Sequence, residues 1–177
     1  FGDYLRSGAI AKFSPIMTEI IGFANAGGYV MGICNGFQIL TESGLLPGAL
    51  LHNNSHKFIC KNIYLKVETK NSLITNHYKK KAIKIPIAHG EGKYFADEKT
   101  MKSLIQNDQV LFSYCDENGD ITKKANPNGS LLNIAGICNA DRNVFGMMPH
   151  PERSADKELN NEDGLSLFKS ILAEILS

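Results

Sequence analysis

A short apolar run that leads into a cysteine flanked by glycines constrains this chain more than any other feature. Residues 29–33 read Tyr-Val-Met-Gly-Ile, which is typical of a strand. Gly32, Cys34 and Gly36 then form a G-x-C-x-G sequence, and residues 37–42 are typical of a helix opening. This is the pattern of a nucleophile elbow with cysteine in place of serine. We expect Gly32 and Gly36 to remove side chains that would collide around the turn.

The elbow has two chemical consequences. The sulfur of Cys34 lies at a helix N-terminus, where unpaired N–H groups and the helix dipole favour a thiolate. The backbone N–H of Asn35 points to where an oxyanion forms when a carbonyl carbon is attacked. The alternative interpretation is that Cys34 is a small buried apolar residue, as many cysteines are. The G-x-C-x-G sequence alone does not decide between them.

Composition places the chain among soluble globular proteins. It has 177 residues, enough for one domain, with 43% hydrophobic and 21% charged residues. A net charge of +1 gives no reason to expect a nucleic acid or a membrane surface as partner. No apolar run approaches the roughly 20 residues of a membrane span. The cysteines at 34, 60, 115 and 138 form no C-x-x-C, which favours the reducing cytoplasm and argues against a metal site.

Helical and strand patterns alternate along the chain. Ser14 and Pro15 predict a helix start, with Ile16, Ile20, Phe23 and Ala24 as its apolar stripe and Gly27-Gly28 as its end. Asp97 and Asp163 are candidate caps for two later helices, the last with its apolar face formed by residues 165, 168, 171, 172, 175 and 176. Further strands are expected at residues 58–68, 72–75, 82–88, 109–114, 131–137 and 144–148. This order predicts an α/β layer structure around a mostly parallel central sheet.

A second candidate block follows the last predicted strand. His150 lies between two prolines, which hold it in a stiff position, and Glu152 is two residues further on. In an extended segment the two side chains point the same way, so a carboxylate can fix the imidazole tautomer. A Cys/His/Glu set provides a thiolate, a base and a group that orients the base. The carboxyl ends of strands in α/β sheets are where sites form, which favours bringing Cys34 and His150 together.

Residues 32–38, Gly-Ile-Cys-Asn-Gly-Phe-Gln, and 148–153, Met-Pro-His-Pro-Glu-Arg, resemble the two signature blocks of class I, triad-type glutamine amidotransferases. Further blocks resemble the glutaminase subunits of phosphoribosylformylglycinamidine synthase, at residues 2–6, 9–16, 41–50, 89–92 and 126–130. Together these blocks cover essentially the whole chain. The resemblance implies a single amidotransferase domain over residues 1–177 with a three-layer, flavodoxin-like fold. It also leads us to expect that an N-terminal portion, including strands and an oxyanion-hole segment, is missing from this sequence.

The resemblance also implies a reaction. Cys34 would attack the side-chain amide of glutamine, His150 would move the protons, and Glu152 would hold His150. Asn35 and Gln38 would contact the substrate. The ammonia would pass to a synthetase subunit that binds ATP and Mg²⁺ and converts formylglycinamide ribonucleotide to its amidine in purine biosynthesis. An additional small subunit would be a further partner, and this chain would itself carry no cofactor, because it contains no glycine-rich phosphate loop.

Several alternatives stay open. Gln38 is equally consistent with a solvent-facing helix position, and residues 89–92 with a flexible turn, a glutamine pocket or a partner surface. Cys60, Cys115 and Cys138 lie in strand-like contexts typical of inert core residues. At the level of the whole protein, a stand-alone cysteine hydrolase or peptidase of the same fold would share the elbow and the His/Glu block. A non-catalytic regulatory protein would not need the intact Cys/His/Glu set.

Overall fold

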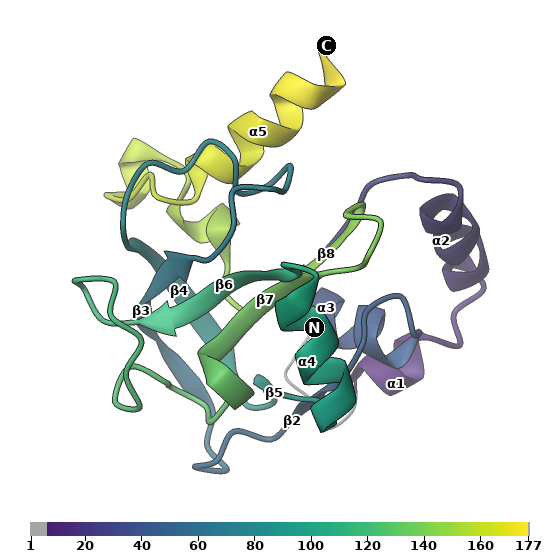
Figure 1. Ribbon diagram of the computed structural model, residues 1–177, viewed down its shortest axis with the longest axis horizontal. Coiled ribbons are helices and arrows are strands. Elements are labelled where there is room, and N and C mark those ends of the chain that lie inside the picture. Colours follow the sequence, from purple (N-terminus) through teal and green to yellow (C-terminus); the bar gives the residue numbers. More distant parts are fainter. Residues whose placement is uncertain (1–6, 177) are drawn as a thin grey trace.

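A six-stranded sheet forms the centre of the fold (Figure 1). The computed structural model describes residues 7–176. Its helices are α1 (Ser7–Ala11), α2 (Ile16–Asn25), α3 (Asn35–Glu42), α4 (Glu98–Gln106) and α5 (Leu165–Ile175), with 3₁₀ turns η1 (Leu131–Asn133), η2 (Pro151–Ser154) and η3 (Lys157–Leu159). Its strands are β1 (Val30–Ile33), β2 (Ala49–Leu51), β3 (Ile59–Val67), β4 (Ile83–His89), β5 (Lys93–Phe95), β6 (Val110–Cys115), β7 (Ile134–Cys138) and β8 (Val144–Met147).

The strand order of the main sheet is β1-β8-β7-β6-β3-β4, and β2 pairs with β5 in a separate two-stranded sheet. β1 and β8 are parallel, with Ile33 opposite Met147. The other adjacent pairs of the main sheet are antiparallel. The α/β class is therefore confirmed, but within the described residues the central sheet is mixed. Hydrophobic periodicity cannot report strand direction, and the short connection between β7 and β8 permits only an antiparallel pair.

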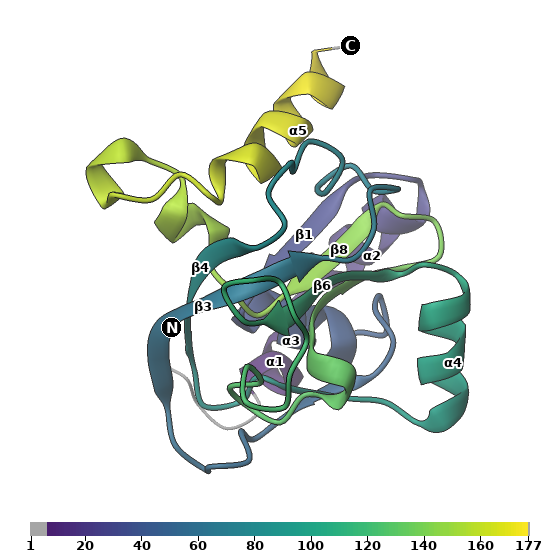
Figure 2. The same cartoon turned by 60° about the vertical axis from the view of Figure 1, so that its left-hand side comes forward.

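Helices cover both faces of the sheet, which gives the expected three layers (Figure 2). On one face, Leu167, Phe168 and Ile171 of α5 pack against buried strand residues such as Leu65 and Phe112. On the other face, α2, α3 and α4 contribute to a second core cluster. Its buried members from these helices are Ala24, Phe37, Leu40, Met101 and Leu104. The sheet is buried between two apolar layers, and its ends remain available for polar groups.

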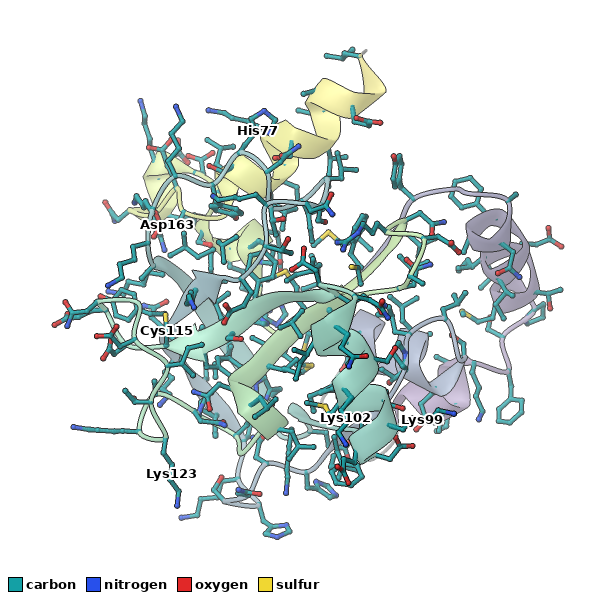
Figure 3. All side chains as sticks on the ribbon, in the orientation of Figure 1. His77, Lys99, Lys102, Cys115, Lys123 and Asp163 are labelled. Carbon is teal, nitrogen blue, oxygen red and sulfur yellow. The ribbon has the colours of Figure 1, made fainter. Side chains whose placement is uncertain are left out.

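The cap at Asp97 is confirmed. Its carboxylate accepts a hydrogen bond from the Thr100 backbone N–H at 2.7 Å, at the start of α4. Lys99 and Lys102 of this helix are exposed (Figure 3). None of the helices in the described part of the chain is long and apolar enough to cross a membrane.

Four expectations for local structure were wrong. Residues 72–75 form a turn, closed by the Thr75 N–H on the Ser72 carbonyl, and not a strand. Helix α2 buries Met17 and Ala24, whereas Ile16 and Phe23 of the predicted stripe are exposed. Asp163 does not cap α5, because its carboxylate accepts hydrogen bonds from the Lys80 ammonium and the Lys84 backbone N–H. Leu172 and Leu176 of the predicted α5 face are also exposed.

The turn between β1 and α3 depends on Gly32. A Cβ at this position would lie 2.5 Å from the carbonyl carbon of Gly36 and 2.6 Å from Leu40 Cδ1. At Gly36, an added Cβ meets no heavy atom of the described residues within 4 Å. The expected steric reason for glycine therefore holds at Gly32 but not at Gly36.

We predict that Gly32→Ala destabilises the protein by about 2–3 kcal/mol, because the new methyl group collides with backbone that cannot rotate away. The matched control is Gly22→Ala in the interior of α2, where an added Cβ meets no heavy atom of residues 7–176 outside the helix within 4 Å. Gly22→Ala should be neutral or stabilising by up to about 1 kcal/mol, because alanine is the better helix former. Urea unfolding of both variants tests this, and equal stabilities would contradict the steric account.

Candidate active site

Cys34 occupies the strained position between β1 and α3. Its φ of 53° and ψ of −108° lie outside the regions that side-chain-bearing residues normally adopt. Its backbone N–H donates to the Met147 carbonyl at 2.8 Å, which continues the parallel pairing of β1 with β8. The side chain is 8% exposed, and Sγ donates to the Ala88 carbonyl at 3.7 Å. The turn therefore aims the sulfur across the end of the sheet towards the last residues of β4.

His150 lies three residues beyond β8, the strand that is parallel to β1. Its backbone N–H donates to the Pro86 carbonyl of β4 at 2.8 Å, and the residue is 9% exposed. Nδ1 and Glu152 Oε1 are 2.6 Å apart. Residues 151–154 form a 3₁₀ turn and not the extended segment expected, yet the carboxylate still reaches the imidazole. Because Glu152 takes the Nδ1 proton as acceptor, Nε2 of a neutral His150 carries the lone pair.

Both candidate residues meet the same strand end. The Ala88 carbonyl accepts a hydrogen bond from the Cys34 thiol, and the Pro86 carbonyl accepts one from the His150 backbone N–H. The C-terminal end of β4 therefore contacts both residues. The buried Nε2 atom of His150 has no hydrogen-bond partner among the described residues. A buried base without a partner and a nearly buried thiol, both bonded to carbonyls of β4, are the two groups that a proton transfer from sulfur to nitrogen requires.

Glu152 is held in its ionised form. Burial acts to raise the pKa of its carboxyl, but the hydrogen bond from His150, a backbone hydrogen bond and the positive charges of His150 and Arg153 outweigh it. The net effect lowers the pKa of Glu152 below its ordinary value. The Arg153 guanidinium lies 3.7 Å from the same oxygen. A carboxylate that stays ionised stabilises an imidazolium at His150.

Asn35 and Gln38 both lie on α3, directly after the nucleophile. The first N–H groups of a helix have no partner within it, so those of α3 are available to a group bound at Cys34. The side-chain oxygen of Asn35 is buried without a hydrogen-bond partner among the described residues. Gln38 lies one turn after Cys34 and is 4% exposed, and its amide donates to the Glu91 carbonyl at 2.8 Å. The solvent-facing alternative for Gln38 is therefore wrong.

Residue 89 ends β4, and residues 90–92 form the loop that follows it. Both His89 and Glu91 are buried, so the flexible-turn alternative for this segment is also wrong. Burial and the nearby charge of His150 lower the pKa of His89 from 6.5 to about 4, although a backbone hydrogen bond opposes them. His89 is therefore a neutral imidazole at physiological pH.

Sequence reasoning missed the residues that hold this loop. Asn53 and Asn128 are almost completely buried, and both bind backbone groups of the segment. Pro86 and Ala88 contribute backbone carbonyls, which every residue has, so their residue types could not identify them as part of the site. An asparagine in a polar loop is ordinary, so only the resemblance of residues 126–130 to a known block pointed to this part of the chain.

Other candidates lie elsewhere. Cys115 and Cys138 are buried, and burial is the main cause that raises the pKa of each thiol to about 11, as expected for inert residues. Cys60 is exposed on β3, so the expectation of a core position is wrong for this residue. Among residues 7–176, no group of three or more His, Cys, Asp or Glu side chains could hold a metal ion. The resembling block at residues 2–6 lies outside the described residues.

Comparison with known proteins gives consistent matches. A family model described as the CobB/CobQ-like glutamine amidotransferase domain matches residues 2–168. The subunit PurQ of phosphoribosylformylglycinamidine synthase from Synechocystis is 58% identical over 96% of this chain and 76% of the relative. The PurQ subunit from Aquifex aeolicus is 51% identical over 98% of this chain and 77% of the relative.

Solved structures agree with the sequence matches. A chain in the structure of PurLQS from Thermotoga maritima superposes with a TM-score of 0.83 and 45% identity, covering 98% of this chain and 74% of that chain. A glutamine amidotransferase from the same organism matches with a TM-score of 0.54 and 13% identity, covering 98% of this chain and 62% of that chain, which supports the fold alone.

We predict that His89 makes the protein acid-sensitive. In the unfolded chain a histidine takes up its proton near pH 6.5, whereas folded His89 does so near pH 4. Between these values the unfolded state binds more protons, so folding stability falls as the pH falls. The gap corresponds to about 3 kcal/mol lost by pH 4. Urea unfolding at pH 7 and pH 4.5 should show that the free energy of unfolding falls less for His89→Gln than for the wild type. An equal fall in both proteins would contradict a buried neutral histidine.

Proposed function

The chain belongs to the family of CobB/CobQ-like glutamine amidotransferase domains, and from this premise we propose that it is the glutaminase subunit of a phosphoribosylformylglycinamidine synthase. PurQ subunits at 51–58% identity support this, and so does the structural match within PurLQS. The observation that carries the chemistry is the strained Cys34 at a helix start, facing the same strand end as the His150–Glu152 pair.

The first half of the reaction releases ammonia. His150 Nε2 accepts the proton of the Cys34 thiol, and the thiolate attacks the side-chain carboxamide carbon of glutamine. The tetrahedral oxyanion is stabilised by the backbone N–H of Asn35 at the start of α3. When the C–N bond breaks, His150 returns the proton to the leaving nitrogen, so ammonia leaves and a glutamyl thioester remains on Cys34.

The second half regenerates the enzyme. Water attacks the thioester while His150 accepts one of its protons, and the C–S bond breaks to release glutamate. The proton on His150 returns to the Cys34 sulfur. Glu152 stabilises the imidazolium in both halves because its carboxylate remains bonded to Nδ1. Gln38, buried one turn after the nucleophile, contacts the bound glutamine from α3.

The ammonia is used by a partner. A synthetase subunit binds ATP and Mg²⁺ and converts formylglycinamide ribonucleotide to its amidine, and a small accessory subunit completes the assembly. This chain needs no cofactor, because its chemistry uses only a thiol, an imidazole and a carboxylate. The nucleophile must remain a reduced thiol, which favours the cytoplasm as the location.

We predict that Cys34→Ala abolishes ammonia release from glutamine, because the thioester cannot form. The matched control is Cys60→Ala, which removes an exposed thiol on β3 and should leave the rate unchanged. Ammonia is measured for this chain alone and assembled with its synthetase subunit, and activity should rise on assembly. Wild-type rates in Cys34→Ala would rule out the nucleophile. Peptide or ester hydrolysis without any glutaminase activity would support the stand-alone hydrolase instead.

We predict that Glu152→Gln lowers kcat by roughly 10²- to 10⁴-fold with little change in KM, because the imidazolium loses its counter-charge. Glu158→Gln, in the exposed η3 turn, is the control and should behave as wild type. Steady-state kinetics with glutamine separates the two parameters. A change confined to KM would show that Glu152 binds substrate and does not orient His150.

A further inference from the structure

Asn53 is a buried hub that joins the loop before β3 to the loop after β4. Its side chain is 0% exposed. Its amide nitrogen donates to the carbonyls of Lys57 and His89, each at 2.9 Å. Its amide oxygen accepts from His89 Nδ1 and the Gly92 N–H, each at 3.1 Å. Its backbone N–H donates to the Gly90 carbonyl at 2.8 Å, so Asn53 binds three of the four residues 89–92.

These bonds use both hydrogens of the amide and both acceptor sites of its oxygen. Loss of the side chain would leave several backbone groups buried without partners, which is costly. The His89 ring packs directly against Gly92, where an added Cβ would lie 2.3 Å from Cε1 of the ring. The loop is therefore held in one conformation by hydrogen bonds on one side and ring packing on the other.

The same hydrogen bonds fix the state of His89. The Asn53 oxygen can only accept, so Nδ1 of His89 carries the proton and Nε2 carries the lone pair. That Nε2 atom is buried without a hydrogen-bond partner among the described residues, as is Nε2 of His150. An acceptor that is buried and unpartnered fits a ligand that brings an N–H donor.

The loop also touches the catalytic elements. Ala88, directly before it, accepts from the Cys34 thiol, and the Glu91 carbonyl accepts from the Gln38 amide. A displacement of residues 89–92 would therefore alter the surroundings of both the nucleophile and the predicted substrate contact. Asn128 supports the far end of the loop through the Gly92 carbonyl at 2.7 Å.

We propose that Asn53 is a positioning residue for glutamine binding: it holds residues 89–92 as a wall of the glutamine pocket and fixes His89 so that Nε2 accepts an N–H of the bound substrate. This inference rests on the proposed glutaminase function. It assigns the loop to the substrate and not to the partner surface, and Asn53 acts through the loop without touching the reacting atoms.

The test separates binding of glutamine from reactivity of the thiol. In Asn53→Ala, assembled with the synthetase subunit, KM for glutamine should rise about tenfold or more while kcat changes little. Alkylation of Cys34 by a chloromethyl ketone analogue of glutamine should slow about tenfold, whereas alkylation by iodoacetamide should keep its wild-type rate. Mass spectrometry of the peptide that contains Cys34 reports both rates.

Asn54→Ala, in the same loop but exposed, is the matched control and should leave every rate unchanged. Gly92→Ala displaces the His89 ring with Asn53 intact and should raise KM similarly, which covers the case in which Asn53→Ala does not fold. Parallel loss of both alkylation rates, or unchanged KM in both folded variants, would overturn the positioning role. Absence of glutaminase activity in the wild-type complex would instead overturn the proposed function.

Discussion

The backbone conformation of Cys34 is the constraint on which the rest of the site depends. A φ of 53° for a residue with a side chain is unfavourable and persists only where neighbours enforce it. Here the Cys34 N–H is held by the Met147 carbonyl of the parallel strand, and Gly32 lets the Gly36 backbone approach closely. The strain turns the sulfur away from its own strand and places it at the start of α3.

The end of β4 is the second fixed element, and it explains how groups far apart in the sequence meet. β4 is an edge strand of the main sheet. Those of its carbonyls that do not bond to β3 are therefore available to other partners. Pro86 and Ala88 use them to bind the His150 backbone and the Cys34 thiol. The following loop is in turn fixed by buried asparagines. The thiol and the His150 backbone are therefore positioned by hydrogen bonds to β4 carbonyls.

Much of this could be predicted from the sequence, because the decisive signals were local. The elbow and the Asp97 cap follow from residue type and spacing, whereas the His150–Glu152 contact was expected from an extended segment and forms at a 3₁₀ turn. Strand direction could not be predicted, since the apolar pattern is the same in both orientations. The predicted cap of α5 was wrong because the Asp163 carboxylate instead accepts hydrogen bonds from the Lys80 ammonium and the Lys84 backbone N–H. Asn53 was missed because its burial and its hydrogen bonds to residues 89–92 arise only in the folded chain.

The central claim is that Cys34 forms a covalent glutamyl thioester with the help of His150. The most direct measurement is rapid acid quenching of the complex during turnover of isotope-labelled glutamine, followed by mass spectrometry of its cysteine peptides. The account predicts a labelled glutamyl group on the peptide that contains Cys34, formed far more slowly in His150→Asn. Label on the peptide of Cys60, Cys115 or Cys138, or turnover with no labelled cysteine at any quench time, would contradict it.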